Sequence, residues 1–140
     1  MATDITRALK YSVILHLAAD GALTAVVPAE RIRALQVPSQ IRWPFIRYGS
    51  PITTGFEATC WSGASNRVTL HAFAETSNAG AGEDIALDIC ALIVDRMKIF
   101  APADLRLIEN EWLSTDIVRD GDEADRWHAF SQFTITAVPA

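Results

Sequence analysis

This 140-residue chain is poor in the features that mark several common protein classes. It has only two cysteines, Cys60 and Cys90, which are too few for a disulfide framework or a four-ligand zinc site. Its twelve Lys and Arg are outnumbered by seventeen Asp and Glu, so the net charge of −5 provides no basic excess for neutralising nucleic-acid phosphates or an anionic membrane. We therefore expect no nucleic-acid or membrane partner.

Targeting signals and catalytic motifs are also missing from the sequence. Residues 1–20 lack the pattern of a signal peptide, and every apolar run is far shorter than the ~20 residues that span a bilayer. We expect a protein made and kept in a cytoplasm, with free thiols. The sequence contains no H-E-x-x-H, G-x-S-x-G, G-x-x-x-x-G-K-[ST] or G-x-G-x-x-G. We expect no catalytic residues, no cofactor and no metal.

Two chemical alternatives stay open at this stage. Cys60 and His71 could meet across a hairpin as nucleophile and base of a small enzyme. The acidic stretch 116–125 could hold a divalent cation, although its residue order does not match an EF-hand and a solvated hairpin tip is the simpler interpretation.

Hydrophobic periodicity predicts two amphipathic helices. The first covers residues 4–19, with Thr3 or Asp4 as N-cap and Asp20-Gly21 ending it through a left-handed glycine. The second begins near residue 82 and is stopped by Pro102. Its apolar stripe runs through Ile85, Ile89, Leu92 and Arg96, and it is widened by Ile93, Met97 and Phe100.

Strand patterns fill the rest of the chain. We predict strands at residues 43–49, 105–118 and 127–138, and a hairpin over residues 56–75 that turns at residues 62–66. Asp120-Gly121 predicts a second hairpin turn. The predicted fold class is α+β, with one domain over residues 1–140. Its antiparallel or mixed sheet has four to five strands covered by the N-terminal helix and the central helix.

Charge is divided unevenly between the two halves of the chain. Residues 1–70 hold seven basic and four acidic groups, a net +3, whereas residues 71–140 hold five basic and thirteen acidic groups, a net −8. One interpretation is that the folded domain mixes both halves over one surface. The other is a molecule with a basic side and an acidic side, suited to head-to-tail association between copies.

The order and spacing of several soft motifs resemble the small tail-completion or tail-terminator proteins of long-tailed phages and gene transfer agents. The first is Val37-Pro38 followed by Trp43-Pro44-Phe45-Ile46-Arg47-Tyr48-Gly49, which is similar to that family's "VP…PY/F-V/I…G" segment. A strand of the type Val68–Ala74, a helix from Gly82 and an aromatic last strand, Trp127–Phe133, follow in the family's order. The resemblance covers nearly the whole chain.

The resemblance implies a non-enzymatic virion protein, assembled in a host cytoplasm. Such proteins form homo-oligomeric rings, commonly of six copies, that cap the head-proximal end of the tail tube. The implied partners are the tail tube protein and the head-tail connector or stopper protein, with DNA only as passing cargo. The alternatives are a head-side stopper or adaptor ring and, from another class, a cytoplasmic ligand-binding α+β domain.

A ring needs one surface of each copy to meet a different surface of the next. Our hypothesis is that basic side chains of the first half face the acidic loop of a neighbouring copy. Trp43 and Trp127 are further interface candidates, because aromatic residues and arginine are enriched at interface centres. The charged candidates are Arg31, Arg33, Arg42 and Arg47 on one side, and Asp116, Asp120, Asp122, Glu123 and Asp125 on the other.

Overall fold

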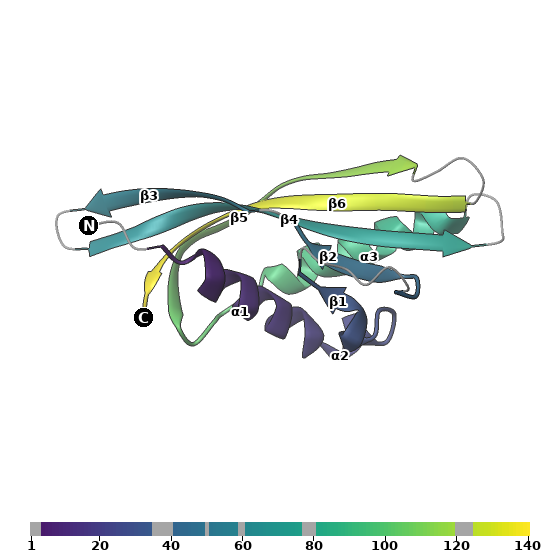
Figure 1. Ribbon diagram of the computed structural model, residues 1–140, viewed down its shortest axis with the longest axis horizontal. Coiled ribbons are helices and arrows are strands. Elements are labelled where there is room, and N and C mark those ends of the chain that lie inside the picture. The colour runs from purple at the N-terminus through teal and green to yellow at the C-terminus, as the bar shows by residue number, and fades with distance from the viewer. Residues whose placement is uncertain (1–3, 35–40, 50, 59–60, 77–80, 120–124) are drawn as a thin grey trace.

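A computed structural model describes residues 4–34, 41–49, 51–58, 61–76, 81–119 and 125–140 (Figure 1). Its fold class is α+β, as predicted. The elements are, in chain order, α1 (Thr6–Ala18), α2 (Gly21–Thr24), the 3₁₀ turn η1 (Ala29–Arg31), β1 (Ile32–Arg33), β2 (Phe45–Tyr48), β3 (Ile52–Ala58), β4 (Trp61–Thr76), α3 (Ala81–Met97), β5 (Leu105–Arg119) and β6 (Asp125–Pro139). In the described part of the chain, no helix combines the length and apolar character that crossing a bilayer requires.

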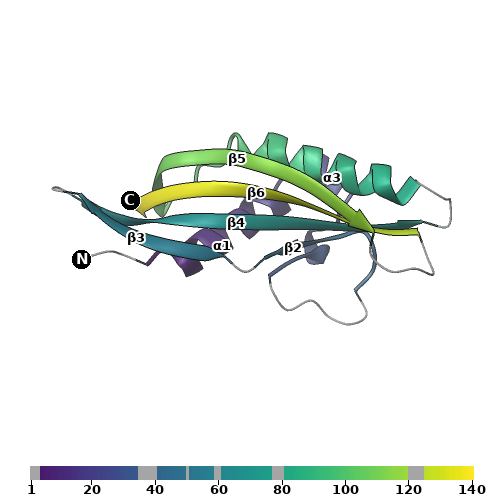
Figure 2. The ribbon, with the colours of Figure 1, turned by 90° about the horizontal axis from the view of Figure 1, so that it is seen from above.

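The strands form a single mixed sheet in the order β1-β2-β4-β6-β5, with β3 also paired to β4. The described strands number six, where four to five were expected; the additional strand is the two-residue β1, which pairs with β2. Among the described strands, only β1 and β2 run parallel to each other. Along one edge of β4, β2 pairs with residues 70–73 and β3 with residues 61–67, so β2 and β3 follow one another along that edge (Figures 1 and 2).

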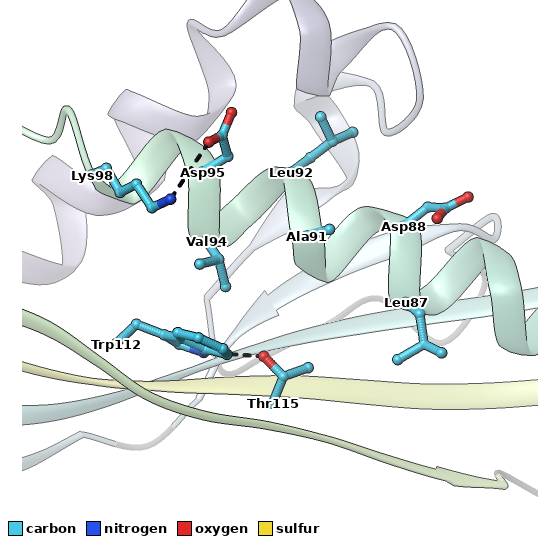
Figure 3. A pocket seen from close by; sticks show the side chains of 9 residues that line it. All are labelled: Leu87, Asp88, Ala91, Leu92, Val94, Asp95, Lys98, Trp112 and Thr115. Carbon is cyan, nitrogen blue, oxygen red and sulfur yellow. Dashed lines mark hydrogen bonds and ion pairs between the residues drawn. The ribbon is translucent and has the colours of Figure 1, made fainter.

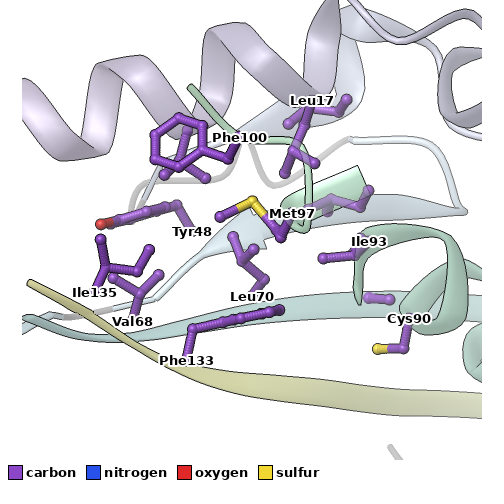
Figure 4. Packing of buried hydrophobic residues seen from close by; sticks show 14 of the residues in the cluster. Leu17, Tyr48, Val68, Leu70, Cys90, Ile93, Met97, Phe100, Phe133 and Ile135 are labelled. Atoms are coloured by element: carbon purple, nitrogen blue, oxygen red, sulfur yellow. The ribbon is translucent and has the colours of Figure 1, made fainter. Parts of the chain in front are cut away.

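One face of the sheet carries the core. Alternate residues of β4 and β6 point to this face, as the period of two in the sequence predicted. The helices α1 and α3 contribute the other half of the same hydrophobic cluster (Figure 4). The buried sheet residues are Val68, Leu70, Ala72 and Ala74 of β4 and Ala129, Phe133, Ile135 and Ala137 of β6.

The α1 helix buries Leu9, Val13 and Leu17 at the predicted spacing, but its end differs from the prediction. Gly21 does not close α1 with a left-handed turn, because it is the first residue of α2. The carboxylate of Asp20 accepts hydrogen bonds from the amides of Ala22 and Leu23 and thereby starts α2 as its N-cap. At the other end of α1 the N-cap position is Ile5, but the predicted Asp4 accepts a 2.8 Å hydrogen bond from the amide of Thr6, the first helical residue. Thr3 lies outside the described residues.

The buried side of α3 agrees with its predicted stripe in part: Ile89, Ile93 and Met97 are buried as predicted. Ile85 and Leu92 are only partly buried, whereas the smaller Gly82, Ala86 and Cys90 face the sheet. A Cβ at Gly82 would lie 2.8 Å from the carbonyl oxygen of Asp125, so this side of the helix approaches β6 too closely for larger residues. The small residues therefore decide which side of α3 is buried.

The predicted turn at residues 62–66 was wrong, because these residues are the first part of β4. Their small size serves close packing, since a Cβ at Gly63 would overlap the carbonyl oxygen of Ala137 in β6. Asn66 is buried and accepts a 2.7 Å hydrogen bond from the hydroxyl of Thr53 in β3. The hairpin itself is confirmed, with β3 ending at Ala58 and β4 beginning at Trp61.

Candidate assembly surfaces

The predicted basic residues lie on or next to β1 and β2, at one end of the sheet order. We call Arg31, Arg33 and Arg42 the basic edge. Arg33 is exposed, and its Nε donates a 2.8 Å hydrogen bond to the carbonyl of Glu30. Arg31 is partly buried and lies 3.5 Å from the carbonyl oxygen of Trp43, while Arg42 is exposed. The structure therefore brings three of the four predicted arginines to the same side of the molecule.

The fourth arginine, Arg47, belongs to the sheet face opposite the helices. Its guanidinium lies 5.6 Å from the ring centre of Phe73, and its backbone pairs with His71. Trp43 is also engaged within the chain, because its ring packs edge-on against Phe45 and Phe73 at 5.2 and 5.8 Å. The interface hypothesis requires both side chains to protrude toward a neighbouring copy, but both pack within the chain.

Aromatic and histidine side chains form a ladder over three strands on this open face. Phe45, Phe73 and His128 are register neighbours on β2, β4 and β6, and their rings stack at 4.5 and 4.2 Å. In the adjoining row, His71 lies beside Phe130, and its Nδ1 is 2.6 Å from Nε2 of His128. Burial, followed by the charges of His128 and Arg47, lowers the pKa of His71 from 6.5 to about 4. His71 is therefore neutral at physiological pH.

Acidic side chains gather at the opposite end of the sheet order, on β5 and on the outer side of α3. Asp116 is exposed on β5, as are Glu109 and Glu111. Asp88 and Asp95 are exposed on α3. Three predicted residues of this side, Asp120, Asp122 and Glu123, lie outside the described residues, as does the predicted Asp120-Gly121 turn.

The two remaining interface candidates form an internal anchor. Asp125 accepts one hydrogen bond from the backbone amide of Gly82 at 2.9 Å and another from the indole of Trp127 at 2.6 Å. These bonds fix the N-terminal end of α3 to β6, where an acidic group is also favourable to the helix dipole. Trp127 packs against the hydrophobic cluster as well.

A groove of about 670 Å³ runs between α3 and β5 (Figure 3). It exists because α3 packs over β4 and β6, which leaves the inner side of the outermost strand β5 partly uncovered. Trp112 of β5 is 52% exposed here, and its indole nitrogen donates to the hydroxyl of Thr115 at 3.1 Å. The groove is lined by Leu87, Asp88, Ala91, Leu92, Val94, Asp95, Lys98, Trp112 and Thr115.

Sequence reasoning missed this groove. No pattern in the sequence shows that α3 stops short of Trp112. The available signal was a large aromatic residue among the charged positions Glu109, Glu111 and Asp116 of one strand, since charge is typical of an edge strand.

The basic edge and the groove lie at opposite edges of the sheet, beside its first and its last strand. Three strands, β2, β4 and β6, separate β1 from β5. At ~4.8 Å per strand, this separation is about 19 Å. One copy cannot bring the two surfaces into contact with each other.

The described residues offer little for catalysis. Among them, no three His, Cys, Asp or Glu lie close enough together to hold a metal ion. Burial raises the pKa of the Cys90 thiol to about 11, which removes its nucleophilic form at neutral pH. Cys60 lies outside the described residues, and His71 pairs in register with β2 and β6, beyond the end of the β3–β4 pairing.

Comparisons with known proteins agree on one class. Residues 12–137 match a family model described as tail completion protein gp17. A solved chain from the "Virion of native gene transfer agent (GTA) particle" superposes with a TM-score of 0.79 at 17% sequence identity, covering 99% of this chain and 100% of that one. At this identity the likeness establishes a shared fold. No individually curated protein matches the chain in sequence.

Proposed function

This chain belongs to the tail completion protein gp17 family, and on that premise we propose that it is a tail terminator. Family membership makes it a structural protein of a virion tail that assembles with other virion proteins, and not an enzyme. The proposal adds a position. Copies of the chain form a ring that caps the head-proximal end of the tail tube and joins it to the head connector.

The observation that carries the ring is the placement of opposite charges at opposite ends of one sheet. The basic edge lies beside β1, and Asp116 and its acidic neighbours lie on β5. A contact between unlike surfaces is heterologous, so it repeats from copy to copy and closes into a ring when the rotation between copies allows. We take the number of copies to be six and residues 1–140 to be one domain of the ring.

The charged candidates from the sequence fit this arrangement to different degrees. Arg33 and Arg42 are exposed as the interface hypothesis requires, and so is Asp116 on the acidic side, whereas Arg31 is partly buried beside Trp43. We propose that the other four candidates stabilise the contact indirectly. Arg47 and Trp43 pack against the aromatic ladder, and Asp125 and Trp127 anchor α3 to β6. Asp120, Asp122 and Glu123 complete the proposed acidic side.

The fold likeness to a chain of a gene transfer agent virion supports a location in a phage or phage-like particle. In that position DNA passes through the ring without binding it, which agrees with the net charge of −5. A head-side stopper or adaptor ring is the second candidate, because the same head-to-tail contact would build it.

The test has two parts. Negative-stain microscopy and native mass measurement of the purified protein should show a hollow ring, and a compact monomer at high concentration would contradict the proposal. Binding to purified tail tube protein, but not to portal protein, is the expected result for a terminator. The reverse preference would support the stopper. We propose that the ring, by capping the tube, also ends its growth, so particles made without the protein should carry tails of unregulated length.

A further inference from the structure

The groove between α3 and β5 exposes apolar surface of the kind that a binding partner covers. Trp112 is 52% exposed beside the apolar side chains Leu87 and Val94. Val118, another large hydrophobic residue that this strand exposes, pairs with His128 and lies on the opposite face of the sheet, so the apolar surface of the groove is centred on Trp112. Edge strands are normally protected with charge or by a covering element, and contiguous exposed apolar surface marks an interaction site.

The rim of the groove selects the chemistry of what enters it. Asp88 and Asp95 stand exposed on the α3 side, and the nearest lysine, Lys98, lies 3.9 Å from Asp95. The rim therefore keeps a net negative charge over an aromatic floor. An arginine meets both demands, because its planar cation stacks on an indole while its aliphatic stem covers apolar surface.

The opposite side of the molecule presents such an arginine. Arg33 is exposed on β1, the strand at the far end of the sheet order. One of its five N–H groups bonds the carbonyl of Glu30, which holds the side chain in place and leaves the planar end available for other acceptors. The exposed Val26 lies just before η1 and supplies apolar surface on the same segment.

We propose that the α3–β5 groove receives Arg33 of a second copy, with the guanidinium beside Trp112 and within the negative potential of Asp88 and Asp95, whose carboxylates lie on the outer side of α3 (Figure 3). This inference rests on the proposed ring, and it names the contact that builds it. Because β2, β4 and β6 separate Arg33 from its own groove, the contact forms between copies. Every copy then gives one arginine and receives one.

A charge exchange between two variants tests the contact. Variant one is D88K/D95K, and variant two is R33E; all three positions are exposed, so both variants should fold, as circular dichroism will verify. Alone, each places like charges together and should self-associate at least about tenfold more weakly than the parent chain. Mixed in equal amounts, each variant complements the other, and native mass spectrometry should find assemblies containing both in equal number. A ring of six can close by such alternation.

Matched controls are available on exposed sites away from both surfaces. R7E makes the same charge change as R33E, D104K makes at one position the change that D88K/D95K makes at two, and both controls should assemble like the parent chain. A parent chain that never assembles would overturn the ring itself. If the parent chain assembles and D88K/D95K and R33E do so equally well, the ring stands and the groove assignment fails. If both variants fail alone and the mixture does not recover, the groove binds another partner, and Arg33 is not its ligand.

Discussion

His71 and His128 share a hydrogen bond of 2.6 Å between Nδ1 of the first ring and Nε2 of the second, across the neighbouring strands β4 and β6. Such a bond needs one donor and one acceptor nitrogen, so the pair loses it when both rings are fully protonated. Phe73 and Phe130 pack beside the pair, and the guanidinium of Arg47 lies close by. The groups around this pair on the open face of the sheet therefore favour the neutral form of His71.

Stability should fall as the pH is lowered from about 6.5 to 4. The pKa of His71 is lowered to about 4 in the folded chain, so in this range the unfolded chain binds the proton and the folded chain does not. The loss should reach about 1–2 kcal/mol, since partial contact with water reduces the effect. Urea unfolding at pH 7 and pH 5 measures it. H71N keeps a polar atom near Nδ1 and should have a flatter pH profile, and an unchanged profile would contradict the assignment.

The stability lost when an isoleucine in or next to α3 is shortened to alanine should depend on how deeply its side chain is buried. Ile93 is fully buried, whereas Ile99, just after the helix, is 65% exposed. I93A should cost about 2–5 kcal/mol of unfolding free energy because it leaves a cavity, and I99A less than about 1 kcal/mol. Denaturant midpoints of the two variants compare the same chemical change at two degrees of burial. Equal losses would contradict the burial of Ile93 in the hydrophobic cluster.

Gly63 should tolerate no side chain. A Cβ there would overlap the carbonyl oxygen of Ala137 and approach Val138 to 2.8 Å, so G63A should destabilise the chain by about 1–3 kcal/mol. Gly21 is the control, because nothing lies within 4 Å of its Cβ position. G21A should leave the thermal midpoint unchanged or slightly raised. Equal midpoints for the two variants would contradict the close approach of β4 and β6.

Asp20 should act through both of its carboxylate oxygens. One caps α2, and the other lies 2.9 Å from Nε of Arg96 in α3. D20N keeps the cap and loses the ion pair, so it should cost up to about 1 kcal/mol. D20A loses both and should cost about 1 kcal/mol more. Chemical denaturation resolves the two steps, and identical losses would mean that the cap contributes nothing.

Assembly should weaken as salt is raised. The proposed contact pairs exposed charges, which are screened over ~10 Å at 0.1 M ionic strength and ~3 Å at 1 M. Sedimentation at 0.05 M and 0.5 M sodium chloride should show ring dissociation at the higher salt, with the apolar floor of the groove retaining some association. Rings that strengthen with salt would point to a wholly hydrophobic contact instead.

Local patterns predicted the elements well, and they failed where burial depends on size. The alternation in residues 68–74 identified the inner face of β4, and the spacing of Leu9, Val13 and Leu17 identified that of α1. The buried side of α3 was predicted only in part, and the place of the hairpin turn was wrong. Small residues explain both: a cluster of glycine and serine is typical of a turn, and a helical alanine gives little apolar signal, but in this fold small residues allow strands and helix to approach closely.

The assembly surfaces were predictable only as charge. The excess of Arg in the first half and of Asp and Glu in the second gave the two sides, but not which members face outward. Arg47 and Trp43 pack against Phe73 of the ladder, and Asp125 and Trp127 anchor α3 to β6. These contacts join segments that are distant in the sequence. The groove at Trp112 depends on how far α3 covers the sheet, which no local pattern contains.

The sequence by itself determined the α+β class, the buried stripe of β4 and the uneven halves of charge, since these follow from periodicity and composition along the chain. The tertiary structure decided that the charged halves lie at opposite ends of one sheet. That placement comes from the strand order β1-β2-β4-β6-β5, in which the first and the fifth strand become the two sides. Strand order is set by long-range pairing, so a difference between two halves of a chain becomes a difference between two sides of a molecule only after folding.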